Sequence, residues 1–342
     1  MSKTEKTKRP TIVDVAKAAG VAVSTVSHAL NNKGYVEKST KAKILKAVQA
    51  LGYRPNLRAR GLRGGGSKTI ALISAMPLGV AGGTSKLGFL MELAAVAAEE
   101  AMRRGLSLVL VPPQPSCQTM PQLEIDGALV VEPTADDACM KWLYDCGLPA
   151  VALGRWVGHD ETPYVDLLSA DAAALLLRHL KESGARKLAV MLGEQIRFSY
   201  LETERVYLDF CREQGQEPLL YKLDEIEGEI AGQVCAAQML RDHPDVDGLL
   251  ALVDAFAVGA ARAAEGLGVK VPQQLKIATR YDGLRAKLCR PPLTALNLHL
   301  DQVAAMGVEL LARLLNGDEQ PAVLWPAKPE LVARESTVAG PA

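Results

Sequence analysis

Residues 22–32, AVSTVSHALNN, gather short hydrogen-bonding side chains in one segment. These side chains are hydroxyls, an imidazole and a carboxamide, carried by Ser24, Thr25, Ser27, His28 and Asn31. Short hydroxyls allow a helix to approach a phosphate backbone closely and to hydrogen-bond with it. No acidic residue occurs between positions 15 and 36, so nothing in this stretch would repel a polyanion. The segment therefore predicts a nucleic-acid contact, with an ordinary solvated Ser/Thr-rich helix as the alternative.

Charge is distributed very unevenly along the chain. Residues 1–68 hold 15 Lys/Arg and 3 Asp/Glu, whereas the whole chain of 342 residues holds 39 of each and has no net charge. The rest of the chain therefore carries 24 basic and 36 acidic residues. A small basic head on an acidic body is typical of a polyanion-binding domain joined to a second function. A solvated basic tail is the alternative.

Three short helices are expected to position the polar segment. Residues 11–19 have apolar side chains at helical spacing, with Thr11 as the N-cap, Asp14 in the first turn and Gly20 as the terminator. A second helix is expected over about 23–31, with Val26, Ala29 and Leu30 facing inward and the polar side chains facing outward. Two helices joined by a glycine-containing turn predict a helix-turn-helix arrangement.

A third helix, over about 38–51, is expected to brace the first two. Its apolar face would consist of Ile44, Leu45, Val48 and Leu51, and Pro55 blocks its continuation. Residues 54–68, RPNLRARGLRGGGSK, then contain four arginines and three consecutive glycines. A segment this short is a marginal helix alone but could fold on DNA. Its GGGSK run is not a phosphate-binding loop, because Ser67 stands where that motif needs glycine before the lysine.

The body, residues 69–342, alternates short apolar runs with amphipathic stretches. Runs such as TIALISA, GALVVEP, KLAVMLG and LKIATRY are typical of buried parallel strands. Helical stretches are expected between them, at 86–104, 169–183, 201–214, 230–242, 255–267 and 301–315. This alternation predicts two doubly wound α/β lobes that enclose a cleft, with a ligand beyond the carboxyl ends of the strands.

Composition narrows the class of protein further. The chain is 49% hydrophobic and 23% charged, which is ordinary for a globular protein. No apolar run approaches the roughly 20 residues of a membrane helix, and MSKTEKTKRP lacks the apolar core of a secretion signal. Six scattered cysteines without a C-x-x-C pair predict neither a metal site nor a disulfide framework. The simplest expectation is a cytoplasmic protein without a cofactor.

Two long stretches carry a family resemblance. TIVDVAKAAGVAVSTVSHALNN followed by YVEKSTKAKILKAVQALGYRPN closely resembles the DNA-binding head of the lactose-repressor (LacI/GalR) family of bacterial transcription regulators. The body segments VDGLLALVDAFAVGAARAAEGLGVKVPQQLKIATRYDG, PPLTAL and PELVARESTV resemble the regulatory domain of that family, so the resemblance covers residues 10–338. It implies an all-α head at 1–53, a hinge helix and linker at 54–68, and a periplasmic-binding-protein-like body at 69–342.

The resemblance also implies roles for individual residues of the head. Base edges in the major groove would be read by Val23, Ser24 and His28, and phosphates would be contacted by Thr11, Thr25, Ser27, Asn31, Tyr35 and Thr40. His28 stands where an arginine is usual, so the bidentate reading of guanine is lost. Ala22 and Glu37 stand where the family has serine caps. The loss of a side-chain cap costs about 1 kcal/mol.

In the hinge, Asn56, Ala59 and Leu62 match the motif of a helix that enters the minor groove in paired copies. A leucine wedge at Leu62 would open a central base step, at a cost that extra contacts with bent DNA repay. Gly61 would weaken an isolated hinge helix by about 1 kcal/mol. DNA and the second subunit would have to stabilise it.

The implied effector pocket departs from the family pattern. The usual sugar-gripping arginine falls on Thr203, the usual Asn-Asp pair reads Val253-Asp254, and a common aspartate reads Gly154. The candidate effector contacts are Arg155, Ser199, Thr203, Phe256, Arg280 and Asp282, with Asp254 interpreted as a helix cap. Three interpretations remain open: another metabolite such as an acid held by arginine, a sugar held by other residues, or little dependence on a ligand.

The resulting prediction is a sequence-specific DNA-binding regulator, a repressor controlled by a sugar, sugar acid or other metabolite bound between two lobes. It would act as a homodimer on a double-stranded operator with dyad symmetry. A solute-binding protein without a regulatory role is the alternative. An enzyme is not expected, because the chain has no G-x-S-x-G, dinucleotide or clustered His-carboxylate motif.

Overall fold

The computed structural model describes residues 11–31, 36–51, 67–77, 80, 88–112, 120, 122–317 and 322–338. The chain divides into two units, one formed by residues 1–65 with 144–148 and the other by the remaining residues. Four residues with predicted DNA contacts, Tyr35, Asn56, Ala59 and Leu62, lie outside the described residues. The predicted boundaries at 53/54 and 68/69 therefore remain predictions.

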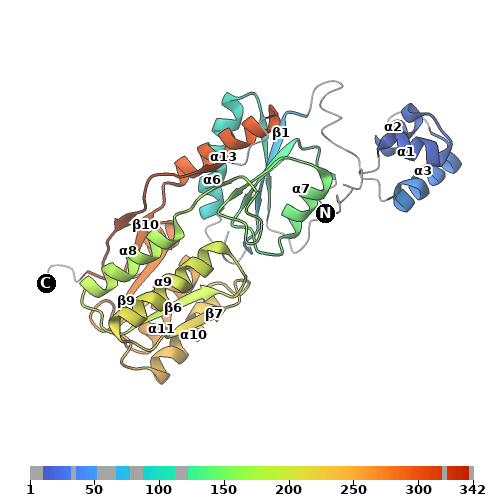
Figure 1. The fold of residues 1–342 in the computed structure, drawn as a ribbon. Helices are drawn as coiled ribbons and strands as arrows, with labels where there is room; N and C mark the ends of the chain where they lie inside the picture. Colours follow the sequence, from blue (N-terminus) through green and yellow to red (C-terminus); the bar gives the residue numbers. More distant parts are fainter. Residues whose placement is uncertain are drawn as a thin grey trace, which may run out of the picture. The chain divides into compact units, whose positions relative to one another are not determined.

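The head contains three helices, α1 (Ile12–Ala19), α2 (Val23–Asn31) and α3 (Lys38–Leu51), as predicted (Figure 1). The amide of Thr11 donates to the carboxylate of Asp14 at 2.7 Å, which satisfies one free donor at the start of α1. Gly20 ends α1 with φ +67°, a conformation that glycine adopts without strain. The sequence therefore fixes both ends of this helix locally.

A small apolar core joins the three head helices. Its buried side chains are Val15, Ala16, Val26, Ala29, Ile44 and Ala47. The prediction for α3 was wrong at Leu45, which is 50% exposed, and Ala47 is buried instead. Leu51 is also exposed, because it lies at the last residue of the helix. The apolar face of α3 is therefore narrower than its sequence suggests.

The first lobe of the body is a six-stranded parallel sheet in the order β11-β5-β4-β3-β1-β2. Its strands are β1 (Thr69–Ser74), β2 (Ser107–Val111), β3 (Gly127–Val131), β4 (Ala150–Leu153), β5 (Tyr164–Val165) and β11 (Val323–Leu324). The helices α6 (Phe89–Arg103) and α13 (Leu300–Leu315) pack together on one face, and α7 (Ala138–Cys146) lies across the sheet from them (Figure 1). Leu110 is 38% exposed because β2 is an edge strand.

The second lobe has a six-stranded sheet in the order β12-β10-β9-β8-β6-β7. Its strands are β6 (Leu188–Gly193), β7 (Leu220–Leu223), β8 (Gly248–Ala251), β9 (Lys276–Tyr281), β10 (Thr294–Asn297) and β12 (Glu330–Val332), of which only β12 pairs antiparallel. The helices are α8 (Ser169–Glu182), α9 (Phe198–Gln214), α10 (Glu229–Asp242), α11 (Asp254–Gly266) and α12 (Leu284–Leu288). These two lobes confirm the predicted α/β architecture.

The cysteines differ from expectation at one position. Cys139 takes part in a disulfide bond, which the scattered spacing in the sequence did not predict. Cys211, Cys235 and Cys289 are free thiols. No helix among the described residues is long and apolar enough to span a bilayer.

Candidate functional site

The polar face of α2 is directed away from the head core. Val26 and Ala29 are buried, while Ser24 and His28 are exposed and Thr25 and Ser27 are half-buried. The carbonyl of Ala22 accepts from the amides of Thr25 and Val26 at 3.0 and 3.2 Å, so the helix starts without a side-chain cap. The structure therefore presents a row of small polar groups on one helix of a basic unit.

The remaining head positions have mixed surroundings. Thr11 is exposed, but its hydroxyl also donates to the Asp14 carboxylate at 2.7 Å. Thr40 is half-buried on the first turn of α3. Glu37 is exposed, and its carboxylate accepts from the Ser39 hydroxyl at 2.9 Å. Asn31 closes α2, and its side chain lies outside the description.

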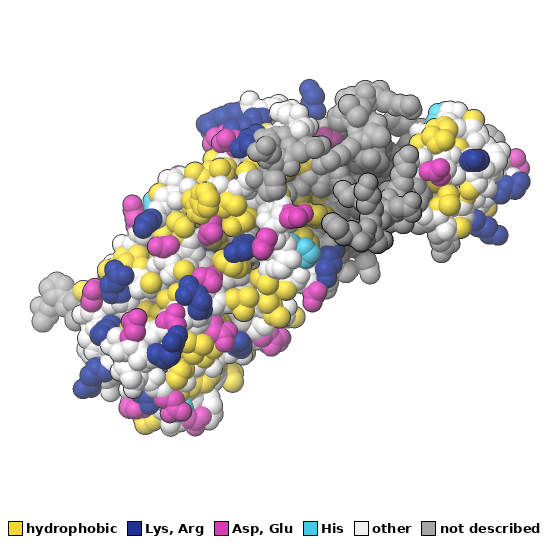
Figure 2. Space-filling model, in the orientation of Figure 1, with side chains coloured by type: hydrophobic (Ala, Val, Ile, Leu, Met, Phe, Trp, Pro, Cys, Tyr) yellow, Lys and Arg dark blue, Asp and Glu magenta, His cyan; other side chains and the backbone are white. Residues whose placement is uncertain are grey.

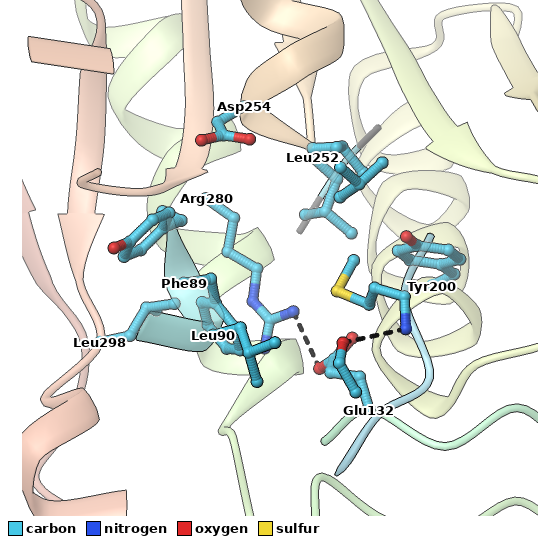
Figure 3. Close-up of a pocket in the computed structure, with 13 residues that line it drawn as sticks. Phe89, Leu90, Glu132, Tyr200, Leu252, Asp254, Arg280 and Leu298 are labelled. Carbon is cyan, nitrogen blue, oxygen red and sulfur yellow. Dashed lines mark hydrogen bonds and ion pairs between the residues drawn. The ribbon is translucent and has the colours of Figure 1, made fainter. Parts of the chain in front are cut away.

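A cavity lies where the carboxyl ends of the strands of both lobes meet. About 560 Å³ of space not filled by atoms lies between its walls, and this figure includes open solvent at the mouth. Its walls come from the first lobe through Ser74, Met76, Val80, Phe89, Leu90 and Glu132, and from the second lobe through Tyr200, Leu252, Val253, Asp254, Arg280, Tyr281 and Leu298. Figure 3 shows Arg280 and Glu132 pointing toward each other from opposite walls. This confirms the predicted placement of a cleft at the strand ends.

Glu132 holds the polar centre of the cleft. It follows β3 and adopts φ +49°, a region that non-glycine residues rarely enter. One carboxylate oxygen pairs with Arg280 at 3.2 Å, and the other accepts from the Ser199 hydroxyl at 2.6 Å. Glu132 and Arg280 are 4% and 6% exposed, so this ion pair is almost completely removed from water. It joins β3 of the first lobe to β9 of the second.

Gly154, at the end of the neighbouring strand β4, lies beside the Glu132 carboxylate. Gly154 has φ +98°, and a Cβ placed on it would lie 3.5 Å from the Glu132 carboxylate and 3.1 Å from Leu167. A side chain at Gly154 would therefore be strained by the positive φ and would press on Leu167. Where the family resemblance implies an aspartate at 154, the chain has glycine, and the carboxylate that lies near this position is that of Glu132.

Arg197, which the sequence analysis did not single out, is the second polar centre. It is the N-cap residue of α9, is 1% exposed, and donates to the carbonyls of Glu132 and Ala75, the latter at 2.9 Å. It also forms an ion pair with Glu225 at 3.3 Å, and the Tyr200 hydroxyl donates to the same carboxylate. Burial opposes the Arg197 charge, but Tyr200 and Glu225 raise the guanidinium pKa on balance.

A third group of contacts joins the second lobe to the first beside the cavity. Arg285 pairs with Asp254 at 3.3 Å and donates to the Val80 carbonyl at 2.7 Å. The Tyr281 hydroxyl donates to Glu92 of α6 at 2.6 Å. Burial raises the pKa of the Asp254 carboxyl even though Arg285 lowers it. Asp254 is the first residue of α11, after the N-cap Val253. Its side chain lines the cavity, and its carboxylate also accepts from the Ala255 amide in the first turn of the helix.

The six predicted effector residues are divided by the structure. Arg280 lines the main cavity, whereas Arg155 and Ser199 line a smaller neighbouring hollow together with Glu132. Arg155 also pairs with Asp160 at 2.7 Å and lies 5.0 Å above the Phe198 ring.

Thr203, Phe256 and Asp282 are not among the described residues that line either cavity. The Thr203 hydroxyl donates to the Ser199 carbonyl at 2.8 Å, Phe256 is fully buried in the core, and Asp282 pairs with Arg334 at 2.6 Å. Sequence position alone placed these three side chains in the cleft, but packing directs them elsewhere. Among the described residues, no cluster of three or more His, Cys, Asp or Glu could hold a metal ion.

Comparisons with known proteins agree with this geometry. Residues 11–56 match the family model of bacterial regulatory proteins of the lacI family, and residues 177–337 match a periplasmic binding protein-like domain. The two models cover the helix-turn-helix head and most of the second lobe.

Proteins that match almost the whole chain are also transcription regulators. The chain is 28% identical to the ribose operon repressor of Halalkalibacterium halodurans, covering 96% of this chain and 98% of the relative. It is also 28% identical to the transcriptional repressor PurR of Haemophilus influenzae strain PittEE, covering 95% and 98%. The solved complex of the regulator CelR with cellobiose matches with a TM-score of 0.73 and 25% identity, covering 96% of this chain and all of that one. Residues 11–56 therefore match the DNA-binding domain of the lacI family, and the whole chain is similar to repressors of that family, which makes it a DNA-binding transcription regulator.

Proposed function

We propose that this regulator is a cytoplasmic repressor that binds, as a homodimer, an operator with dyad symmetry and responds to a small metabolite held between its lobes. The observation that carries the proposal is the row of exposed and half-buried polar side chains on α2, in a head whose core is complete within itself. Two repressors among its relatives support the proposed repression of transcription, and a regulator solved with cellobiose supports the proposed response to a small molecule.

The proposed DNA contacts are those that the family resemblance implies. Val23, Ser24 and His28 would face base edges, and Thr25, Ser27, Thr11, Asn31 and Thr40 would contact phosphates, with Tyr35 in the following loop. Asn56, Ala59 and Leu62 would contribute from a hinge helix in the minor groove. The proposed domains are the head at 1–53, the hinge at 54–68 and the body at 69–342.

The proposed effector site is the main cavity, in which Arg280 and Glu132 are the central polar pair. Arg155 and Ser199 would act from the adjoining hollow. Binding that favours one lobe arrangement over another would change operator affinity by the difference in stability of the two states.

The decisive test is selection of bound fragments from genomic DNA, followed by a gel-shift titration of the selected sequence. We expect His28→Ala to weaken binding of the selected operator by about 10- to 100-fold, because one base-edge contact is worth about 1–3 kcal/mol. Binding to unrelated DNA should change little, since phosphate contacts provide the affinity that does not depend on sequence.

The matched control is His159→Ala, which removes an exposed histidine of the body. We expect it to bind the operator as the wild type does. Selection that yields no preferred sequence, or equal loss with both variants, would refute the proposed role of α2.

A further inference from the structure

The charged groups that line the main cavity are already neutralised by other charges of the same chain. Arg280 is paired with Glu132 at 3.2 Å, and Asp254 is paired with Arg285 at 3.3 Å. Each of these four side chains is at most 8% exposed. Opening a buried ion pair to bind a charged ligand leaves one charge desolvated and uncompensated, which is costly.

Most side-chain hydrogen-bonding groups on the described part of the cavity wall are also occupied. Both Glu132 carboxylate oxygens have partners, the Tyr200 hydroxyl donates to Glu225, and the Tyr281 hydroxyl donates to Glu92. The Ser74 hydroxyl accepts from the Met76 amide at 3.2 Å. A polyhydroxylated ligand needs many free donors and acceptors, since each hydroxyl buried without a partner costs free energy.

One donor in the cavity wall remains free. Among the described residues that line the cavity, the Nε–H of Arg280 is the buried polar side-chain group without a hydrogen-bond partner. The guanidinium is held by Glu132 and Ser169, so this donor has a fixed position. The nitrogen itself is buried, so this donor does not reach the open space of the cavity and is not available to a ligand there.

The rest of the described wall is apolar. Met76, Phe89, Leu90, Leu252 and Leu298 surround the space beside the Arg280–Glu132 pair. Figure 3 shows Phe89, Leu90 and Leu298 on one side of that pair and Leu252 on the other. Burial of an apolar ligand surface against these side chains is favourable in proportion to its area.

We infer that the effector is an uncharged, largely apolar small molecule, and not a sugar or a charged acid. The inference rests on the proposed function, in which this cleft is the effector site. Glu132 would determine this specificity, because it neutralises the charge of Arg280 in the ligand-free protein.

Thermal unfolding of the full chain with four probes at equal concentration tests the ligand class. The probes are benzamide, which is neutral and mostly apolar, its charged analogues benzoate and benzylammonium, and D-glucose. We expect benzamide to raise the midpoint by about 3 °C at a tenfold excess over its dissociation constant. Benzoate, benzylammonium and glucose should leave the midpoint unchanged.

Two variants, each with its own control variant, make the test specific to the cavity. Glu132→Gln leaves the Arg280 charge without a counter-charge, so benzoate should gain at least about tenfold in affinity while benzamide changes little. Glu99→Gln, an exposed change on α6, is its control and should behave as the wild type. Leu90→Trp fills the cavity and should abolish the benzamide shift, whereas Leu201→Trp at an exposed position of α9 should keep it.

The inference is overturned if benzoate, benzylammonium or glucose stabilises the wild type as strongly as benzamide, or if benzamide gives no shift. If Glu132→Gln does not fold, the wild-type series and the Leu90→Trp pair still decide the question. The same preparation is assayed for selective binding of genomic fragments. Selective DNA binding without a benzamide shift refutes the ligand class alone, whereas loss of selective DNA binding refutes the proposed function.

Discussion

Glu132 shows how one residue can define a binding site. Its backbone is held at φ +49°, a conformation that costs of order 1–3 kcal/mol for a non-glycine residue. The strain is retained because both carboxylate oxygens and the backbone carbonyl are bonded to the second lobe through Ser199, Arg280 and Arg197. A strained residue fixed in this way is typical of a functional site.

At the residue scale, His179 on α8 predicts a dependence of stability on pH. Burial lowers the pKa of this imidazole below its ordinary value of 6.5, and its ring lies 2.8 Å from the Thr337 hydroxyl and 3.4 Å from that of Ser183. Glu182 opposes the shift without cancelling it. As the pH falls below about 6.5, the unfolded chain takes up a proton before the folded chain does, so the free energy of unfolding must decrease.

Urea unfolding at about pH 7.5 and about pH 5.5 measures this effect, with His179→Gln as the comparison. Glutamine does not titrate and keeps a polar group near Thr337. We expect the loss of stability between the two pH values to be smaller in the variant. An identical loss in both proteins would exclude His179 as its source.

At the scale of elements, α10 and α11 approach each other through glycines. A Cβ on Gly259 would lie 2.1 Å from the Glu229 carbonyl oxygen, and one on Gly232 would lie 2.4 Å from that of Phe256. The obstructing atoms are backbone atoms, which cannot rotate away as a side chain does. The two helices can therefore pack at this distance only without side chains at the crossing.

The substitution Gly259→Ala should lower the free energy of unfolding by at least about 2 kcal/mol, because the helices must move apart. Gly266→Ala is the matched control in the same helix, where a Cβ meets no atom within 4 Å. Since alanine favours helix and restricts the unfolded chain, this control should stay within about 0.5 kcal/mol or become slightly more stable. Equal destabilisation of both variants, measured by urea unfolding, would contradict the close-packing argument.

At the scale of the whole body, the chain passes three times between the lobes. The first two passages lead into α8 and α13, and the residues before these helices, Leu168 and His299, both have φ near +50°. The Leu168 amide donates to Asp166, and the His299 ring bonds the carbonyl of Lys328, which lies on the third passage. The connections that a change of lobe angle would bend are thus held by specific hydrogen bonds.

The exposed side chains of the body also indicate where two subunits could contact each other. Acidic, basic and apolar side chains are interspersed over its visible face (Figure 2). Ile226, just before α10, and Ile230 and Val234 within it are 68%, 63% and 66% exposed at a spacing of four residues. Because such a stripe gains free energy by burial, we propose it as part of the contact in the homodimer.

Ile230→Glu should convert the dimer to a monomer, since it places a charge in an apolar contact. Sedimentation velocity measures the mass, and Leu208→Glu on α9, also exposed, is the control. We expect only the α10 variant to dissociate and to lose operator affinity. A dimer with unchanged stability in Ile230→Glu would place the interface elsewhere.

The sequence by itself determined the head helices and most strands of the body. The capping pair Thr11 and Asp14 and the terminator Gly20 act within a few residues, so their effect can be read locally. Continuous apolar runs likewise specify strands that are buried on both faces of a parallel sheet. Predictions from such local signals were wrong mainly at the ends of elements, as at α9, which was expected from residue 201 but begins at Phe198.

Only the tertiary structure decided the chemistry of the cleft. Glu132 and Arg280 are 148 residues apart in the chain, and Arg197 bonds Ala75 across 122 residues. The family resemblance implied that Thr203, Phe256 and Asp282 contact the effector, but in the structure they bond the Ser199 carbonyl, lie in the core and pair with Arg334, respectively. Pairing between side chains so far apart depends on how two separately folded sheets meet, and no local pattern of residue types encodes that geometry.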